Sequence, residues 1–244
     1  MMRENLIIYI VAAPDLSHTF EELKTAFGVE RSININRDLY IKTYEKISRI
    51  YNAPVIIAYS KTKKYYDLRW LSEAEPGFLD VFDISYHQAF LKTAELAFKT
   101  GSKKVLWINH LCPFITQDDI NFAVSNITDK NLVIGPAKNG GVYFIGFSRD
   151  ALKIFENIYP LRESLYEDLL DKIKKNRFSY MDLEERLLIK DNESLKAWIE
   201  SGDYIADLKK LSAMQETSSD AENKPKKKHK EKDLPTHQTG DNLA

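Results

Sequence analysis

The sequence predicts an α/β protein: a three-layer α/β/α sandwich around a mostly parallel central sheet. Short apolar runs typical of buried strands alternate along the chain with longer segments of helical periodicity. This alternation is the pattern of βαβ units, which form parallel sheets covered by helices. The apolar runs end at Gly, Pro or Asn, where loops begin. In an open sheet of this kind, the loops that leave the carboxyl ends of the strands form the ligand crevice.

The first half of the chain is expected to hold three strands and three helices. Each strand is an apolar run, and the helices repeat apolar residues at helical spacing or end at a glycine. Residues 60–82 show neither pattern and are expected to be irregular. In chain order, the elements are a strand at 6–13, a helix from about 17 to 27, a helix at 38–51, a strand at 54–59, a helix at 85–99 and a strand at 104–108.

The second half continues the alternation. Asp118 and Asp119 follow Thr116, and acids are favoured in a first helical turn because they oppose the helix dipole. Residues 142–147 follow a Gly-Gly turn and are expected to run antiparallel to their neighbours. The elements are a helix from about 116, strands at 132–134 and 142–147, helices at 150–158 and 162–176, a strand at 186–189, and a helix at 192–201 capped by the Asp191/Asn192 pair.

The bulk composition describes one globular domain and excludes several classes of protein. At 244 residues with 43% hydrophobic and 11% aromatic residues, the chain can bury one sizeable core. Thirty-five basic residues against 36 acidic ones give a net charge of −1, so no overall field draws the protein to nucleic acid. Cys112 is the single cysteine, which excludes an intrachain disulfide, and no Cys/His cluster has zinc-ligand spacing.

The longest apolar run, at 6–13, is far shorter than the roughly 20 residues that a membrane helix needs. A signal peptide is an alternative reading, because the basic residue Arg3 precedes the run. The run is β-branched, however, Glu4 also precedes it and Pro14 follows it, so a first strand fits better. We therefore expect a cytoplasmic protein with no membrane span.

The chain divides into a domain at 1–211 and a tail at 212–244. The tail has almost no apolar residues and carries Lys224-Pro-Lys-Lys-Lys-His-Lys-Glu-Lys232. This composition predicts disorder. Polyanion binding or targeting is the alternative role, but the acids in the tail dilute its charge and favour a solubilising segment.

Two segments of the domain resemble a known family. The family pattern G-x-x-x-V-x-x-I-G-[ST]-D-x-P-x-[LI]-T has its counterpart in residues 101–116, and V-x-G-P-A-x-D-G-G-Y-Y-L-x-G has its counterpart in 133–146. Both are typical of the GT-A-fold, nucleotide-diphospho-sugar-transferase-like family of radical-SAM/selenodomain-associated and arsenosugar-biosynthesis glycosyltransferases. The resemblance implies a Rossmann-like GT-A fold, a Mg or Mn ion, and transfer of a sugar from a nucleoside diphosphate.

The chain departs from this family where the family carries charge. Leu111 stands in the place of an acid that helps to hold the metal ion, and Asn139 stands in the place of the acid before the Gly-Gly pair. Lys190 replaces an acid of a later motif, although Asp191 and Glu193 are near. The resemblance therefore implies a site where metal binding is weak or absent, and it leaves open whether the protein is an enzyme or a pseudoenzyme.

By resemblance, the site residues lie on loops that follow strands of the sheet. Lys190 and Asp191 are the candidate catalytic residues, and no metal-binding residue is predicted. The candidate substrate- and nucleotide-binding residues are Asn109, His110, Leu111, Pro113, Gly135, Pro136, Asn139, Gly140, Gly141 and Tyr143.

Lys190 has two readings. A cation inside the family's metal site could replace the metal ion electrostatically, as basic side chains do in some GT-A enzymes. The simpler reading, which we favour, is that Lys190 points to solvent at a helix N-terminus. Two or more carboxylates converging beside Leu111 in a pocket would support an enzyme, whereas a pocket filled by Leu111 and its neighbours would support a scaffold.

Two further residue pairs have a functional and a structural reading. His110 and Cys112 could form a nucleophile or ligand pair, but no third group is identifiable, so loop and core roles are expected. Asp118 and Asp119 resemble paired carboxylates, yet they are expected to be surface acids that compensate the helix dipole.

We expect a glycosyltransferase-like protein that binds a nucleotide-sugar at a metal-poor site, which is either active or inactive. The alternative is a non-catalytic binding or scaffold protein on the same fold. Its partner surface would be Tyr65, Tyr66 and Trp70, within a basic and aromatic segment at 61–70 that also resembles a nucleic-acid platform. Because the net charge is near neutral, a lid loop or a protein contact is expected there instead of nucleic acid.

Overall fold

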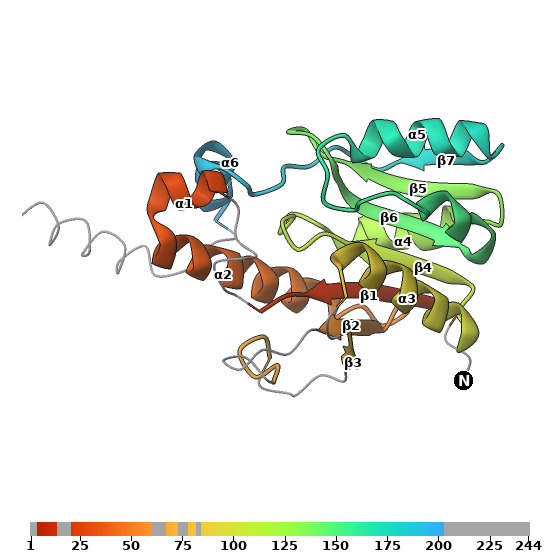
Figure 1. Cartoon of the computed structure of the whole chain (residues 1–244), viewed down its shortest axis with the longest axis horizontal. Helices are drawn as coiled ribbons and strands as arrows, with labels where there is room; N and C mark the ends of the chain where they lie inside the picture. Colours follow the sequence, from red (N-terminus) through yellow and green to blue (C-terminus); the bar gives the residue numbers. More distant parts are fainter. Residues whose placement is uncertain (1–3, 14–20, 60–66, 73–77, 82–83, 203–244) are drawn as a thin grey trace, which may run out of the picture. The chain divides into compact units, whose positions relative to one another are not determined.

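Within the described residues, seven strands form one central sheet (Figure 1). The computed structural model describes residues 4–13, 21–59, 67–72, 78–81 and 84–202. Along the sheet, the strand order is β3-β2-β1-β4-β6-β5-β7. The strands are β1 (Asn5–Val11), β2 (Val55–Tyr59), β3 (Phe78–Asp80), β4 (Lys104–Ile108), β5 (Asn131–Pro136), β6 (Val142–Ser148) and β7 (Ser179–Asp182).

The sheet is parallel apart from β6. β1 pairs in parallel with β2 and β4, β2 with β3, and β5 with β7. β6 runs antiparallel between β4 and β5, as the Gly-Gly turn before it predicted. The mostly parallel sheet and the α/β class expected from the sequence are confirmed.

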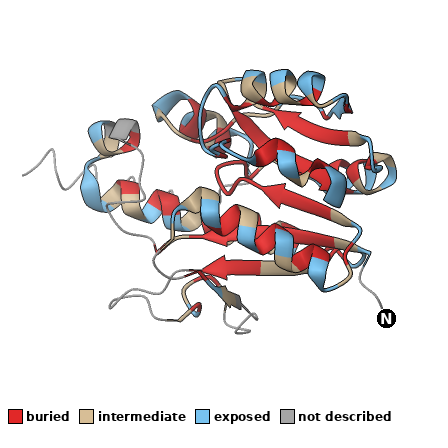
Figure 2. Cartoon of the chain, turned by 45° about the vertical axis from the view of Figure 1, so that its right-hand side comes forward, coloured by how far each residue is buried: buried red, intermediate tan, exposed pale blue. Residues whose placement is uncertain are grey.

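Helices cover both faces of the sheet, and Figure 2 shows buried strands beneath helices whose outer surfaces are exposed. Alternate residues of a strand point to opposite faces. Leu6 and Ile8 share an apolar cluster with α3 and α5, whereas Tyr9 donates its hydroxyl proton to the backbone oxygen of Tyr40 in α2. The helices are α1 (Glu21–Phe27), α2 (Val29–Ile47), α3 (Tyr86–Lys99), α4 (Gln117–Asn126), α5 (Leu165–Lys175) and α6 (Asn192–Glu200), with a 3-10 helix η2 (Arg149–Phe155).

Capping side chains fix where three of these helices begin. Ser85, Thr116 and Asp191 are the N-cap residues of α3, α4 and α6, and each forms a reciprocal capping box. A capping side chain accepts a bond from a backbone N–H that the helix itself leaves without a partner. These three starts agree with the sequence prediction, including the cap at Asp191.

Several expected elements differ in the structure. The helix expected at 38–51 is α2, which begins nine residues earlier at Val29 and directly follows Gly28, whose φ is 76°. The helix expected at 150–158 is the 3-10 helix η2. The strand expected at 186–189 is wrong: this segment makes one isolated bridge, between Arg186 and Ala137.

Two strands were missed for physical reasons. β7 is an edge strand whose four residues are all exposed, so no alternation of apolar and polar residues marks it. β3 has three residues and lies at the other edge of the sheet, within the segment that was expected to be irregular. The predicted tail at 212–244 lies outside the described residues.

Candidate functional site

A pocket of about 230 Å³ opens beside Leu111, and we call it the Leu111 pocket. Four segments meet there: the loop after β4, the turn before β6, the connection from η2 to α5, and the chain leading into α6. Its lining residues are Asn109, Leu111, Gly140, Gly141, Val142, Pro160, Leu161, Arg162, Glu163, Leu188 and Lys190. The pocket therefore lies where the carboxyl end of β4 meets loops, the usual ligand position in such sheets.

The Gly140-Gly141 turn forms one wall of the pocket. Both glycines have a φ of 87°, a conformation that a residue with a Cβ rarely adopts. A Cβ on Gly141 would also lie 3.2 Å from the backbone oxygen of Arg162. Two glycines thus permit the turn and let the 160–163 segment approach it closely.

Lys190 lies inside the pocket. Its side chain is only 14% exposed, and its Nζ atom lies 2.5 Å from Oε1 of Glu163, whose side chain is 79% exposed. The lysine lowers the pKa of the Glu163 carboxyl, chiefly by donating a hydrogen bond and also through its charge. The favoured expectation that Lys190 points to solvent is therefore wrong.

A strap of chain, residues 183–189, carries Lys190 to the pocket. The backbone N–H of Leu183 donates to the oxygen of Ile134 at 2.8 Å, that of Arg186 donates to Pro136 at 3.3 Å, and that of Ile189 donates to Leu111 at 2.8 Å. The strap thus crosses from the end of β5 to the loop after β4. These backbone hydrogen bonds fix the position of Ile189, and therefore of Lys190, which follows it just before α6.

Asn139 binds the strap and not the pocket. Its Nδ2 donates to the backbone oxygen of Leu188 at 2.7 Å, and its Oδ1 accepts from the backbone N–H of Leu188 at 3.1 Å. Both ends of the amide are therefore used for one backbone contact. A carboxylate at this position could accept the second bond but could not donate the first.

Leu111 and Asn109 hold the loop after β4. Leu111 is 2% exposed, and its backbone N–H donates to Oδ1 of Asn109 at 3.1 Å. Asn109 Nδ2 donates to the backbone oxygen of Val142 at 3.3 Å, and the Asn109 N–H donates to that of Tyr143 at 2.9 Å. The loop is thereby tied to the start of β6.

The described lining of the pocket does not fit a Mg or Mn ion. Such ions prefer about six oxygen ligands, of which the protein usually supplies one or two carboxylates while water and substrate phosphates supply the rest. Glu163 is the one carboxylate in this lining, and it is paired with Lys190. The described residues also contain no group of three His, Cys, Asp or Glu side chains that could hold a metal ion. No acids converge in the described part of the pocket, as was expected for an enzyme, and Leu111 does not fill it, as was expected for a scaffold. Neither expected outcome is therefore met.

His110 and Cys112 do not form a reactive pair. The His110 ring stacks on Tyr40, with centroids 3.8 Å apart, and its Nε2 lies 3.2 Å from Oδ1 of Asn36. Cys112 is fully buried, and burial raises the pKa of its thiol to about 12. Both residues are core and loop residues, in agreement with the structural reading.

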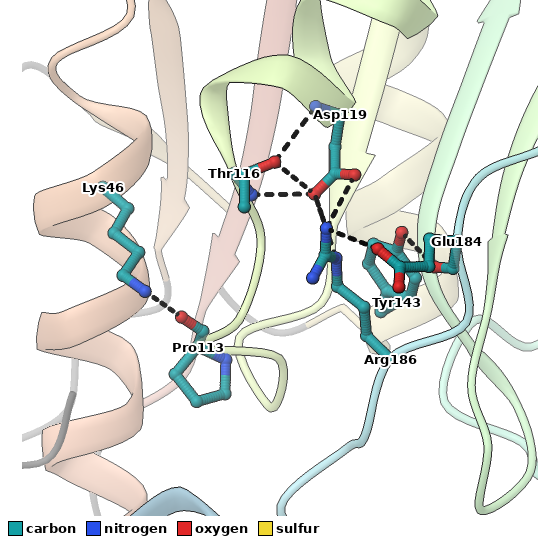
Figure 3. Close-up of polar contacts among 7 residues, drawn as sticks. All are labelled: Lys46, Pro113, Thr116, Asp119, Tyr143, Glu184 and Arg186. Atoms are coloured by element: carbon teal, nitrogen blue, oxygen red, sulfur yellow. Dashed lines mark hydrogen bonds and ion pairs between the residues drawn. The ribbon is translucent and has the colours of Figure 1, made fainter. Parts of the chain in front are cut away.

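Other predicted residues support the loops around the pocket, and Figure 3 shows two of them, Pro113 and Tyr143. The backbone oxygen of Pro113 accepts a hydrogen bond from Nζ of Lys46 in α2 at 2.5 Å. The Tyr143 hydroxyl donates to the backbone oxygen of Glu184 in the strap at 2.9 Å. A Cβ on Gly135 would lie 2.5 Å from the Tyr143 ring, so the glycine makes room for that ring.

Asp119 is not the surface acid that was expected. Its side chain is 8% exposed and accepts two hydrogen bonds at 3.0 Å from Arg186, one from Nε and one from Nη2 (Figure 3). It also accepts bonds from the backbone N–H and the hydroxyl of Thr116 at 2.8 Å. Asp119 therefore links α4 to the strap, whereas Asp118 is exposed as expected.

The structure brings together five of the twelve candidate residues: Asn109, Leu111, Gly140, Gly141 and Lys190 line the pocket. His110, Pro113, Gly135, Pro136, Asn139, Tyr143 and Asp191 are not part of this lining. Asp191 instead caps α6 by accepting from the Ser194 N–H at 2.8 Å. Sequence reasoning missed residues 160–163 as part of the site, because it placed 162–163 in a helix at 162–176 and assigned no role to the residues before it.

The described part of the suggested partner surface is packed against the core. The Trp70 ring lies 5.9 Å from that of Tyr40 and 6.5 Å from that of Tyr59. Tyr65 and Tyr66 lie outside the described residues. Among the described helices, none has the length and apolar character needed to cross a membrane.

Comparison with known proteins identifies a family match and related folds. Residues 48–159 match the family described as "Uncharacterized protein conserved in bacteria (DUF2064)". A provisionally assigned nucleotide-diphospho-sugar transferase from Desulfovibrio desulfuricans G20 superposes with a TM-score of 0.71 at 18% identity, over 89% of this chain and 96% of that one. No curated protein matches the sequence.

Two further solved structures are similar at lower TM-scores. A cytidylyltransferase from Leptospira borgpetersenii has a TM-score of 0.50 at 13% identity, over 92% of this chain and 99% of that one. The 4-diphosphocytidyl-2C-methyl-D-erythritol synthase of Anaerococcus prevotii DSM 20548 has a TM-score of 0.51 at 13% identity, over 82% and 98%. The chain thus has the nucleotide-diphospho-sugar-transferase-like fold that its sequence resembles, and its residues 48–159 match DUF2064.

Proposed function

We propose that the protein binds a nucleoside-diphosphate sugar with the diphosphate in the Leu111 pocket, and that it transfers the sugar without a divalent metal ion. One observation carries the proposal: the Lys190 ammonium is held, 14% exposed, in a pocket at the carboxyl end of β4. The similarity to nucleotide-diphospho-sugar and cytidylyl transferase folds supports a nucleotide-sugar as the ligand. The position of the pocket fits as well, because open α/β sheets bind their ligands at the carboxyl ends of the strands.

A positive charge beside the diphosphate would favour sugar transfer. As the sugar carbon forms a bond to an acceptor, or to water in the absence of one, its bond to the diphosphate breaks and negative charge builds up on the departing diphosphate. A fixed cation lowers the energy of that charged state, and it does so more strongly where water is partly excluded. Lys190 would supply this charge, and Arg162, an exposed residue at the pocket whose guanidinium lies 4.7 Å from the Tyr159 ring, would supply a second cation.

Thermal unfolding of the full chain tests the proposal. The ligands are UDP-, GDP-, CDP- and ADP-glucose and the free diphosphates, each measured in EDTA and in Mg²⁺. A ligand at about 100 times its dissociation constant adds roughly 2.7 kcal/mol of stability, or several degrees for a domain of this size. We expect at least one ligand to raise the melting temperature equally in EDTA and in Mg²⁺.

The variant Lys190→Met should lose at least about half of this shift at the same ligand concentration, because a charged hydrogen bond is worth about 1.5–3 kcal/mol, a factor of about ten or more in affinity. Lys190→Ala should likewise abolish release of the nucleoside diphosphate from its sugar. Lys196→Met is the matched control, since Lys196 is an exposed lysine of α6 outside the pocket lining. An unchanged ligand shift or turnover in the Lys190 variants would remove this lysine from the site.

A further inference from the structure

Glu163 already occupies the position that an anionic ligand would take beside Lys190. Its Oε1 lies 2.5 Å from Nζ of Lys190, and it is the one carboxylate in the described lining of the pocket. A Cβ on Gly140 would lie 3.6 Å from the Glu163 Cβ and 3.8 Å from Nζ of Lys190. The carboxylate, the ammonium and the glycine turn therefore share one small volume.

Glu163 and Lys190 differ in solvent exposure. The side chain of Glu163 is 79% exposed and that of Lys190 is 14% exposed. The backbone of Glu163 is held near the Gly140-Gly141 turn, where its own oxygen would lie 3.7 Å from a Cβ on Gly140. The carboxylate can rotate into water while its backbone stays in place, whereas the lysine stays in the pocket.

We propose that Glu163 is a specificity-determining residue: it acts as an internal competitor that a ligand must displace from Lys190. A carboxylate carries one negative charge, so a ligand that offers no more than a single carboxylate gains little by replacing it. A diphosphate carries more charge and more acceptor oxygens, and charge-assisted bonds strengthen accordingly. The pocket would thus select diphosphates over carboxylates and other weak monoanions. This inference rests on the function proposed above.

Calorimetric titration of the full chain with inorganic pyrophosphate, in EDTA and at constant ionic strength, tests the inference. Glu163→Gln keeps the shape of the side chain and removes its charge. We expect it to bind pyrophosphate about twofold to fivefold more tightly than the wild type, which is the range set by ion pairs with an exposed partner. Acetate should compete with pyrophosphate in Glu163→Gln and should fail to do so in the wild type.

Glu167→Gln is the matched control, because Glu167 is an exposed carboxylate in the first turn of α5 and does not line the pocket. It removes the same charge and should leave pyrophosphate affinity unchanged. An equal gain in both variants would assign the effect to net charge and would overturn the inference.

The remaining outcomes separate the two proposals. If Glu163→Gln binds like the wild type while Lys190→Met binds more weakly, Lys190 is an anion site but Glu163 does not compete, and only the inference is overturned. If Lys190→Met also binds like the wild type, both proposals are overturned. If neither the wild type nor Glu163→Gln binds millimolar pyrophosphate, the inference is overturned, and the nucleotide-sugar panel still decides the proposed function.

Discussion

Asn139 stands where the family that the sequence resembles has an acid, and its side chain holds the strap in place. Both ends of its amide bond the backbone of Leu188, so the residue ties the turn before β6 to the strap. Leu111 likewise has no ligating atom in its side chain and is 2% exposed. At the residue scale, two positions that would carry charge in the family instead contribute packing and backbone contacts.

Placing an acid at position 139 should therefore destabilise the protein. In Asn139→Asp, the Leu188 oxygen loses its donor and faces a carboxylate, a change that costs about 1–3 kcal/mol. Urea unfolding followed by circular dichroism measures the difference. Asn192→Asp is the control, because position 192 is exposed in the first turn of α6, where an acid is favourable. Equal stability of Asn139→Asp and the wild type would contradict the contact to Leu188.

The Cys112 thiol should make stability depend on alkaline pH. Burial raises its pKa to about 12, whereas an unfolded thiol titrates near about 8.5. Above that lower value the unfolded chain releases a proton that the folded chain retains, so unfolding becomes more favourable as the pH rises. Between about pH 8.5 and 10 the free energy of unfolding should fall, by at most about 1.4 kcal/mol per pH unit.

Urea unfolding at a series of pH values checks this prediction, with Cys112→Ala as the comparison. The upper limit of the window matters, because burial also raises the pKa of Tyr9 and Tyr86, which titrate from higher pH. The variant is expected to lose the slope whatever its absolute stability. The same slope in both proteins would show that the thiol is not responsible.

At the scale of elements, the β5–β6 hairpin places the glycine turn at the pocket. Gly135 of β5 pairs with Phe144 of β6, and the ring of Tyr143 crosses the position that a Gly135 side chain would fill. Tyr143 then reaches the strap through its hydroxyl. The hairpin, the strap and the pocket wall are therefore mechanically linked.

Gly135→Ala should be more disruptive than Gly146→Ala. The added methyl group would lie 2.5 Å from the Tyr143 ring and 2.8 Å from the Cβ of Phe144, which cannot move without the backbone. In Gly146→Ala the nearest atom, at 2.6 Å, is the end of the Ile127 side chain. Overpacking of this kind costs about 1–3 kcal/mol. Urea unfolding should rank Gly135→Ala as the less stable variant, and the reverse order would contradict this account of the hairpin.

Sequence patterns predicted the buried elements of this fold better than the exposed ones. β4 was placed to the residue, and the starts of α3, α4 and α6 were predicted to within about one residue. β7 was missed because all its residues are exposed. Residues 186–189 of the strap were predicted to form a strand, although tertiary contacts hold this segment. Apolar periodicity indicates which residues are buried against a core. It therefore cannot predict an exposed edge strand or a segment that is held by backbone hydrogen bonds to other parts of the chain.

The pocket was predictable only in part, for a related reason. The loop after β4 and the glycine turn carry recognisable motifs, and both line the pocket. Residues 160–163 come from the connection between η2 and α5, and only the folded chain brings them to the turn. The inward position of Lys190 likewise depends on the strap and on Glu163, which lies 27 residues away in sequence.

In the described structure as a whole, the fold resembles that of nucleotide-diphospho-sugar transferases, whereas the pocket lacks the acids that would hold a metal ion. The sheet, its antiparallel β6 and the neighbouring structures define a nucleotide-diphospho-sugar-transferase-like fold. The pocket presents Lys190 and one paired carboxylate where the family's pattern implies a metal ion. In the function proposed above, Lys190 supplies the positive charge that a metal ion would supply in the family that the sequence resembles.

The most direct test is the dissociation constant of the best nucleotide-sugar for the full wild-type chain, measured by calorimetry in EDTA and again in Mg²⁺. If Lys190 supplies the charge, the two constants should agree within about twofold, and Lys190→Met should weaken binding by about tenfold or more under both conditions. Binding that requires Mg²⁺, or that persists unchanged in Lys190→Met, would contradict the account.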